Sequence, residues 1–299
     1  MYSDELASSK RAKKPEQTDR LTWGLIELQV TNIERAVVFW TEVLGFTVMH
    51  QFGRSVTLGT QKKPMVVLHP GARKHVQAAH LGLYHFAIGL PDQVEFSRVL
   101  ARLISLHIPV SLVDHLGSKA IYLSDPDGFE IEFTLETPER FSHYGDMSRG
   151  LVLFGVDGQK HNGRQRLDVQ NEVHHAHGTD LKAPFFDDAY LAHMHFNVDD
   201  LAPAQAWFEQ LGFAKNLLLP KLGFADMGAG SAITHRLAMN TWAGPNLLPA
   251  PSDMSRLTHY TLHANDPEVM NTAVGLELAE FGLSGKDPSG TPMSWVPAF

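Results

Sequence analysis

The chain has 299 residues, a formal net charge of −8 and no cysteine. The lack of cysteine excludes disulfides, thiolate nucleophiles and thiolate metal sites, so any bound metal must be held by histidines and carboxylates. The acidic balance, without a long basic run, argues against nucleic-acid or anionic-membrane partners, so we expect a small-molecule partner. No window holds the roughly 20 apolar residues of a membrane span. Because the polar start also lacks a signal peptide's apolar region, we expect a cytoplasmic protein.

Residues 1–20 are polar and aperiodic, which predicts a disordered arm. Residues 25–30 then alternate as a strand, and Asn32 can cap a helix that ends at Gly45. Further strands are predicted at 47–52, 56–58 and 65–69, giving the order β-α-β-β-β.

This order begins again at 84–90, followed by a helix near 94–105, and then at 193–198 and 259–262. Four βαβββ modules predict an α+β protein in which two curved mixed sheets form half-barrels. We expect a first domain of two modules at 21–135, a linker at 136–188 and a second domain of two modules at 189–299.

The second module ends in a predicted hairpin, in which strands at 120–123 and 130–134 are joined by the turn Asp-Pro-Asp-Gly. Glu132 would project from the face opposite Ile131 and Phe133, so a carboxylate is presented from a rigid sheet. By itself this pattern also fits an ordinary hairpin whose acids face solvent.

The four modules can be aligned by their helix caps, which are Asn32, Asp92, Asp200 and Asp266. The residues seven positions earlier are Leu25, His85, His193 and His259. A lone histidine on a strand is more often a satisfied polar or core residue than a ligand. Recurrence at one position of the repeat, on the face away from the helix, favours metal ligands.

With these features the sequence resembles the vicinal oxygen chelate superfamily, in which paired βαβββ modules cup a metal. The stretch with His115, Ile121-Tyr122, the turn and Glu132 is similar to the signature of extradiol ring-cleaving dioxygenases. Together with residues 82–88 and 193–201, it resembles bacterial catechol 2,3-dioxygenases of the CatE type.

The resemblance implies that His85, Glu132 and His193 bind Fe(II), with Mn(II) as the alternative, and leave positions for a catechol-like diol and O2. It further implies cleavage of an aromatic ring beside its two hydroxyls, a step of aromatic hydrocarbon catabolism. His235 would be the acid–base residue, while Tyr122 and His115 would assist as hydrogen-bonding or acid–base groups.

Two positions depart from a complete repeat, because Leu25 replaces a ligand histidine and Ser294 stands where Glu132 stands in the second module. Pairing the second module with the third gathers all three ligands into one site, and we predict this pairing. The remaining pair, with His259 and Ser294, would have too few ligands and would be structural.

Several histidines are expected to be solvated, namely His259 and His263 in the fourth module and His174, His175 and His177 in an exposed loop of the linker. Phe86, Trp242 and Tyr260 are candidates for the substrate pocket. Free edges of curved sheets favour a homo-oligomer.

Two alternative functions remain open from the sequence. One is a non-redox metalloenzyme of the superfamily, such as a glyoxalase-like isomerase or an antibiotic-modifying transferase. The other is a metal-free protein that sequesters a planar molecule.

Overall fold

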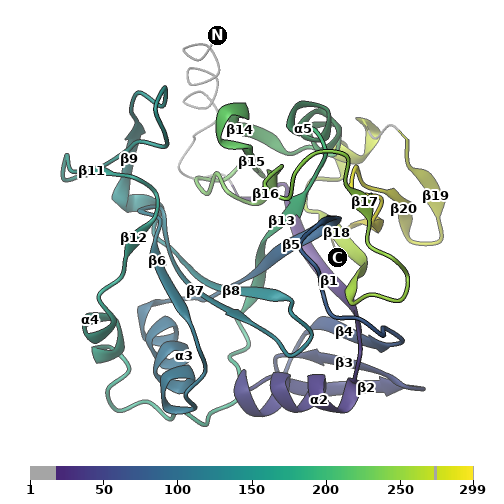
Figure 1. The fold of residues 1–299 in the computed structure, drawn as a ribbon, viewed down its shortest axis with the longest axis horizontal. Helices are drawn as coiled ribbons and strands as arrows, with labels where there is room; N and C mark the ends of the chain where they lie inside the picture. Colours follow the sequence, from purple (N-terminus) through teal and green to yellow (C-terminus); the bar gives the residue numbers. More distant parts are fainter. Residues whose placement is uncertain (1–17, 273–274, 299) are drawn as a thin grey trace.

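The computed structural model describes residues 18–272 and 275–298, in which helices flank two large sheets (Figure 1). Most of the predicted N-terminal arm lies outside the described residues. Its last residues are held in place, since Asp19 pairs with Arg236 at 2.7 Å. Within the described ranges, no helix is both long and apolar enough to cross a bilayer.

The four predicted modules are confirmed. The first consists of β1 (Leu21–Val30), α2 (Ile33–Val38), the π-helix η1 (Phe39–Val43), β2 (Thr47–Phe52), β3 (Ser55–Gly59) and β4 (Pro64–Pro70). The second consists of β5 (His80–Gly89), α3 (Gln93–Ser105), β6 (Ser111–Asp114), β7 (Ser118–Ser124) and β8 (Glu130–Glu136).

The third module consists of β13 (Tyr190–Asn197), α5 (Leu201–Gln210), β14 (Ala214–Leu219), the 3-10 turn η3 (Pro220–Leu222), β15 (Phe224–Gly228) and β16 (Leu237–Asn240). The short β17 (Leu248–Pro249) leads to the fourth module, with β18 (Arg256–Ala264), η4 (Pro267–Thr272), β19 (Glu277–Ala279), β20 (Gly282–Lys286) and β21 (Pro292–Pro297). The helix of the fourth module is shortened to the 3-10 segment η4.

The predicted helix caps are confirmed by hydrogen bonds at the start of each helix. The carboxamide of Asn32 accepts the N–H of Arg35 at 2.7 Å, and the carboxylate of Asp92 accepts the N–H of Glu95 at 2.9 Å. Because these side chains satisfy amides that have no partner within the helix, they fix where each helix begins.

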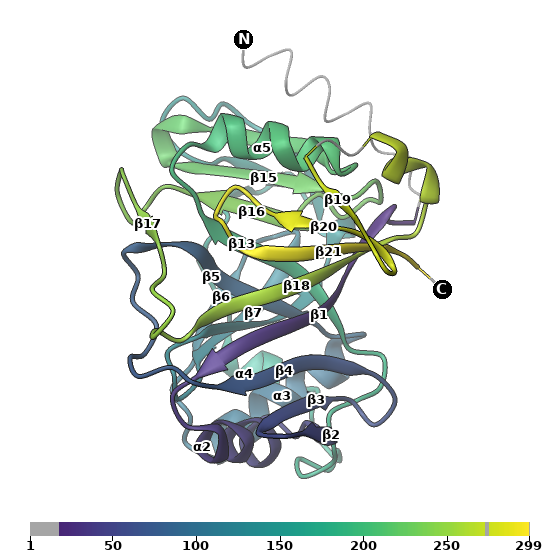
Figure 2. The same ribbon diagram turned by 90° about the vertical axis from the view of Figure 1, so that its right-hand side faces the viewer.

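The strand order confirms the predicted pairing of modules. One sheet runs β19-β20-β21-β18-β1-β4-β3-β2, which joins the fourth module to the first (Figure 2). The other runs β12-β6-β7-β8-β5-β13-β16-β15-β14, which joins the second module to the third. Each sheet therefore combines one module from each half of the chain, while the domain boundaries drawn from the sequence stay a prediction.

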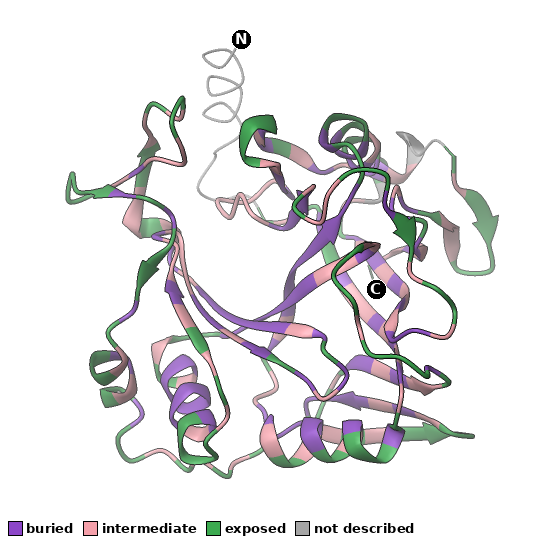
Figure 3. Ribbon diagram, in the orientation of Figure 1, coloured by how far each residue is buried: buried purple, intermediate pink, exposed green. Residues whose placement is uncertain are grey.

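The apolar faces of both sheets contribute to one core (Figure 3). Phe196 of β13 and Tyr260 of β18 lie with their ring centroids 5.7 Å apart, and Trp40 of η1 stacks on Phe86 of β5 at 6.2 Å. The alternate residues of these strands must then face away from the core, and these are the positions that carry the polar groups described below.

The predicted linker packs against the second module. It contains η2 (Pro138–Arg140), β9 (Phe141–Tyr144), β10 (Leu153–Gly155), β11 (Lys160–His161), β12 (Gln165–Arg166) and α4 (Val169–His174), of which β12 pairs with β6. The guanidinium of Arg102 on α3 donates to the carbonyls of Leu181 and Val43, which ties the linker to both N-terminal modules. The histidines at 174, 175 and 177 are exposed, as expected, although His174 ends α4.

Two Asp-Pro-x-Gly turns have the same construction in the second and fourth modules. The carboxylate of Asp125 accepts the N–H groups of Asp127 and Phe129, each at 2.9 Å, and Asp287 accepts the N–H of Ser289 at 2.8 Å. Gly128 has a φ of +89°, which explains the glycine at the end of the turn. Both acids are buried, so the first residue of each turn holds the turn together by hydrogen bonds made inside the protein.

Burial raises the pKa of the Asp125 carboxyl from 3.8 to about 7, against the lowering effect of its backbone hydrogen bonds. The folded chain therefore binds more protons than the unfolded chain between these values, and the stabilisation is lost as the pH rises through the folded pKa. We expect Asp125→Asn to lose less free energy of unfolding than the wild type between about pH 5 and about pH 8, measured by urea denaturation. Asp157 is exposed, so in Asp157→Asn the free energy of unfolding should change with pH as it does in the wild type. The same pH dependence in Asp125→Asn as in the wild type would contradict this assignment.

Candidate metal centre

Three adjacent strands place two imidazoles and one carboxylate on the face of the second sheet that points away from the core. His85 comes from the central strand β5, Glu132 from β8 on one side and His193 from β13 on the other. In the register of this sheet Ala87 faces both Glu132 and His193 across the strands. The three side chains therefore converge although they are far apart in sequence.

The donor atoms form an equilateral triangle. His85 Nε2, His193 Nε2 and Glu132 Oε2 are each 3.2 Å from the other two. Atoms at 3.2 Å separation subtend an angle of about 100° at an ion with bonds of about 2.1 Å. This is the spacing of three ligands on one face of a metal, and in the described residues the group contains these three side chains alone. The donor set therefore fits a divalent transition-metal ion.

The protonation states also suit metal binding. Burial alone would raise the pKa of the Glu132 carboxyl, but the charges and hydrogen bonds of His193 and His85 outweigh it and hold the pKa well below its usual range. Burial lowers the pKa of His193 to about 3, although Glu132 acts in the opposite direction. At neutral pH the site thus offers an ionised carboxylate and a neutral imidazole, the forms that bind metal.

Tyr122 and His115 lie together on one side of this triangle. Tyr122 is the cross-strand neighbour of Glu132, and its ring centroid is 5.7 Å from that of His85. Its hydroxyl is 3.0 Å from His115 Nε2, while His115 Nδ1 contacts the carbonyl of Gly163. Burial raises the pKa of the Tyr122 hydroxyl well above its usual range, so the group stays protonated and can donate a hydrogen bond.

His235 lies on the other side, in the loop before β16. Its ring packs edge-on against His193 with centroids 4.6 Å apart. Asp226 of β15 accepts a hydrogen bond from His235 Nδ1 at 2.9 Å, and the amide of Asn216 holds that carboxylate at 3.0 Å. The carboxylate fixes the imidazole with Nδ1 protonated, which leaves Nε2 for exchange with a reactant.

An aromatic wall borders the centre beyond His193, and of its residues only Trp242 was expected from the sequence. Trp242 is half-exposed, and its ring lies 5.5 Å from His195 and 5.6 Å from Tyr84. Phe224 stacks between Trp242 and His235, with both centroid distances at 6.2 Å. His195 is two residues after His193 on the same strand, so period-two alternation could have placed it here.

Two of the three pocket candidates are wrong. Phe86 and Tyr260 are fully buried in the core and face away from the metal centre. Phe86 directly follows His85 on β5, and consecutive residues of a strand point to opposite faces. Trp242 is the candidate that lies in the aromatic wall.

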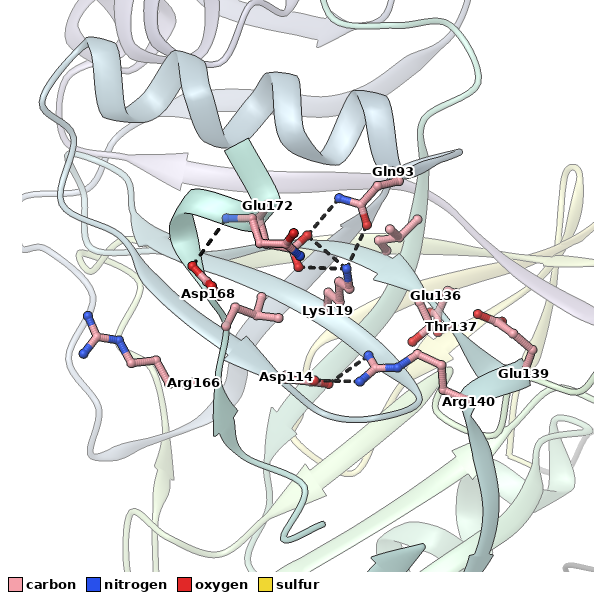
Figure 4. A pocket seen from close by; sticks show the side chains of 13 residues that line it. Gln93, Asp114, Lys119, Glu136, Thr137, Glu139, Arg140, Arg166, Asp168 and Glu172 are labelled. Carbon is pink, nitrogen blue, oxygen red and sulfur yellow. Dashed lines mark hydrogen bonds and ion pairs between the residues drawn. The ribbon is translucent and has the colours of Figure 1, made fainter. Parts of the chain in front are cut away.

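A separate polar hollow of about 600 Å³ lies on the opposite face of β7 and β8, under α3 and α4 (Figure 4). The ammonium of Lys119 lies 2.8 Å from both the carboxylate of Glu172 and the amide oxygen of Gln93, and Arg140 pairs with Asp114 at 2.7 Å. Because these charges are satisfied by one another, the hollow is better explained as the contact that holds the linker on the second module.

A family model described as "Glyoxalase/Bleomycin resistance protein/Dioxygenase superfamily" matches residues 22–133. A protein of Bacillus subtilis (strain 168) named catechol-2,3-dioxygenase is 30% identical over 286 residues, which cover 91% of this chain and 96% of the relative. The chain belongs to the glyoxalase/bleomycin resistance/dioxygenase superfamily. Glyoxalase I of Zea mays shares the superfamily fold with a TM-score of 0.53 at 15% identity, covering 93% of each chain. A point mutant of the same Zea mays enzyme gives a TM-score of 0.54 at 14% identity, covering 93% of this chain and 94% of that one.

Replacing any one of the three donor side chains should weaken the binding of a metal ion at this centre. We expect His85→Ala, Glu132→Gln and His193→Ala each to lower the affinity for the metal ion by at least about 100-fold, because two donors cannot replace three. Anaerobic titration with Fe(II), with metal content measured after desalting, provides the readout. Glu130→Gln, two residues earlier on β8, should bind metal like the wild type. Equal retention in Glu132→Gln would show that the ion lies elsewhere.

Proposed function

We propose that the protein is an extradiol dioxygenase that uses non-haem Fe(II), with Mn(II) as the alternative metal, to cleave a catechol-like ring beside its hydroxyls. The observation that carries the proposal is the triangle of two imidazoles and one carboxylate, without a fourth His, Asp or Glu in the described group. Such a set is typical of non-haem iron oxygenases, since it leaves open positions for substrate and oxygen. The likeness to a relative named catechol-2,3-dioxygenase supports the same reaction.

When bound, the metal would supply neighbouring positions for the two diol oxygens and O2 and would let electrons pass between them. The protein holds that ion with Glu132 ionised and His193 neutral. The half-exposed Trp242 and Tyr84 of the aromatic wall offer flat apolar surface for an aromatic ring.

Proton transfer falls to His235. Asp226 keeps Nδ1 of this imidazole protonated, and the ring lies against His193, so Nε2 is the atom available to exchange a proton with the reactants. On the opposite side, Tyr122 keeps its proton and hydrogen-bonds with His115. In the proposed enzyme its hydroxyl would donate a hydrogen bond to an oxygen of the substrate.

The experiment is oxygen uptake by anaerobically iron-loaded protein with a panel of catechols, together with the absorbance of the yellow ring-opened product. We expect the amount of oxygen consumed to match the amount of ring-opened product formed. Metal-loaded wild type that consumes no oxygen with any of the catechols, and instead isomerises a glyoxalase-type substrate, would contradict the proposal.

His235→Gln should lower kcat about 100-fold or more while the metal content is unchanged, because acid–base groups contribute about 10² to 10⁴ in rate. His175→Gln, an exposed histidine of the linker, is the matched control and should keep the wild-type rate. A wild-type kcat in His235→Gln would show that His235 does not transfer the proton in the reaction.

A further inference from the structure

The aromatic wall beside the metal centre contains polar atoms that the proposed mechanism does not use. The indole N–H of Trp242 donates to the carbonyl of Leu222 at 2.8 Å, so this donor already has a partner. Phe224, the next ring of the wall, has no polar atom. The hydroxyl of Tyr84 and one ring nitrogen of His195 are therefore the groups of the wall that can bind a polar ligand.

Tyr84 reaches the wall because β5 contains a bulge at this residue. His85 faces His195 in the register of β5 with β13. The next facing pair is Leu83 with Phe196, which leaves Tyr84 as the extra residue. Without the bulge Tyr84 would point to the core, since consecutive strand residues face opposite sides, and bulges beside active sites commonly redirect a side chain in this way. Its ring centroid lies 5.3 Å from that of His85 and 4.9 Å from that of His195.

His195 is held so that one nitrogen carries a proton without a partner. The amide oxygen of Asn240 accepts the backbone N–H of Trp242 at 3.0 Å, so its amide nitrogen faces His195 Nε2, also at 3.0 Å. Because an amide nitrogen only donates, Nε2 accepts and the ring proton is on Nδ1.

Neither of these two donors is used within residues 18–272 and 275–298, because no hydrogen bond there involves His195 Nδ1 or the Tyr84 hydroxyl. The side chain of His195 is only 3% exposed. A donor on a buried side chain is rarely left without a partner, so Nδ1 indicates a contact with a bound ligand.

The surroundings of the two donors favour an uncharged partner. Burial raises the pKa of the Tyr84 hydroxyl, Glu130 acts in the same direction and Arg164 acts against both. Charges of both signs therefore lie near this hydroxyl. An uncharged oxygen can accept hydrogen bonds from the hydroxyl and from His195 Nδ1 without bringing a further charge beside the apolar rings.

We infer that Tyr84 and His195 form a subsite for an uncharged oxygen substituent on the substrate ring, such as an alkoxy or carbonyl group. The inference rests on the proposed function, because it takes the ring of a diol bound at the metal centre to lie against the aromatic wall. The subsite borders a metal ligand, since the ring centroid of His85 is 4.8 Å from that of His195. An alkyl substituent would leave Nδ1 without a partner, so such a catechol should bind more weakly.

The test compares catechols that carry either a methoxy or an ethyl group at the same ring position, at each of the two positions available. Iron-loaded full chain is titrated without oxygen, so that the catechols bind without turnover, and the Kd is read from tryptophan fluorescence. For at least one position, we expect the preference for methoxy over ethyl to be about tenfold larger in the wild type than in His195→Phe. Comparing the two proteins cancels the effect of the substituent on the ring itself.

Three further variants identify the group that makes the contact. His195→Asn should keep most of the preference, because its amide can place a donor near the position of Nδ1. Tyr84→Phe should reduce the preference and leave the iron content unchanged. The exposed His175→Gln should behave like the wild type. Circular dichroism and iron content show whether each variant retains the fold and the metal.

The same methoxy-to-ethyl ratio in the wild type and in His195→Phe would overturn the inference. Tighter binding of a catechol with a carboxylate or aminoalkyl group than of the methoxy compound would also overturn it. Should His195→Phe lose iron, an unchanged ratio in Tyr84→Phe would have the same meaning.

The inference and the proposed function can fail separately. A protein that shows the preference but consumes no oxygen with any catechol would keep the subsite and contradict only the ring cleavage. A protein that cleaves catechols with an unchanged ratio in His195→Phe would contradict only the subsite.

Discussion

The metal centre depends on the antiparallel pairing of β5 with β13, which joins the two halves of the chain. This pairing places His193 beside His85 over a sequence separation of 108 residues, and the parallel pairing of β5 with β8 adds Glu132. A shift of one residue in either register would turn one ligand into the core, since side chains alternate between faces. The hydrophobic pattern of these strands thus fixes the donor geometry as well as the fold.

The two large sheets share one core, but the polar groups on their outer faces differ in how far they are removed from water. In the metal centre the carboxylate is almost fully buried, and its ionised state is maintained by two imidazoles that remain within 3.2 Å. In the other sheet Glu27 remains about one-third exposed, so solvent screens its charge. The same strand arrangement therefore gives strongly coupled, buried donors on one sheet and a more exposed contact of Glu27 with His69 and His259 on the other.

The repeat made much of this predictable. Aligning the helix caps identified His85 and His193, and the Asp-Pro-Asp-Gly turn located Glu132, because regular strands fix which face each residue occupies. Asp226 could not be found in this way, since its contact with His235 depends on the path of a loop.

We infer that His85, Glu132 and His193 hold one ion between the second and third modules. The most direct test is an anomalous difference map at the iron absorption edge, from crystals grown anaerobically with Fe(II). We expect a strong peak about 2.1 Å from each of the three donor atoms. A map with no peak among them, or with iron bound by only one of them, would contradict it.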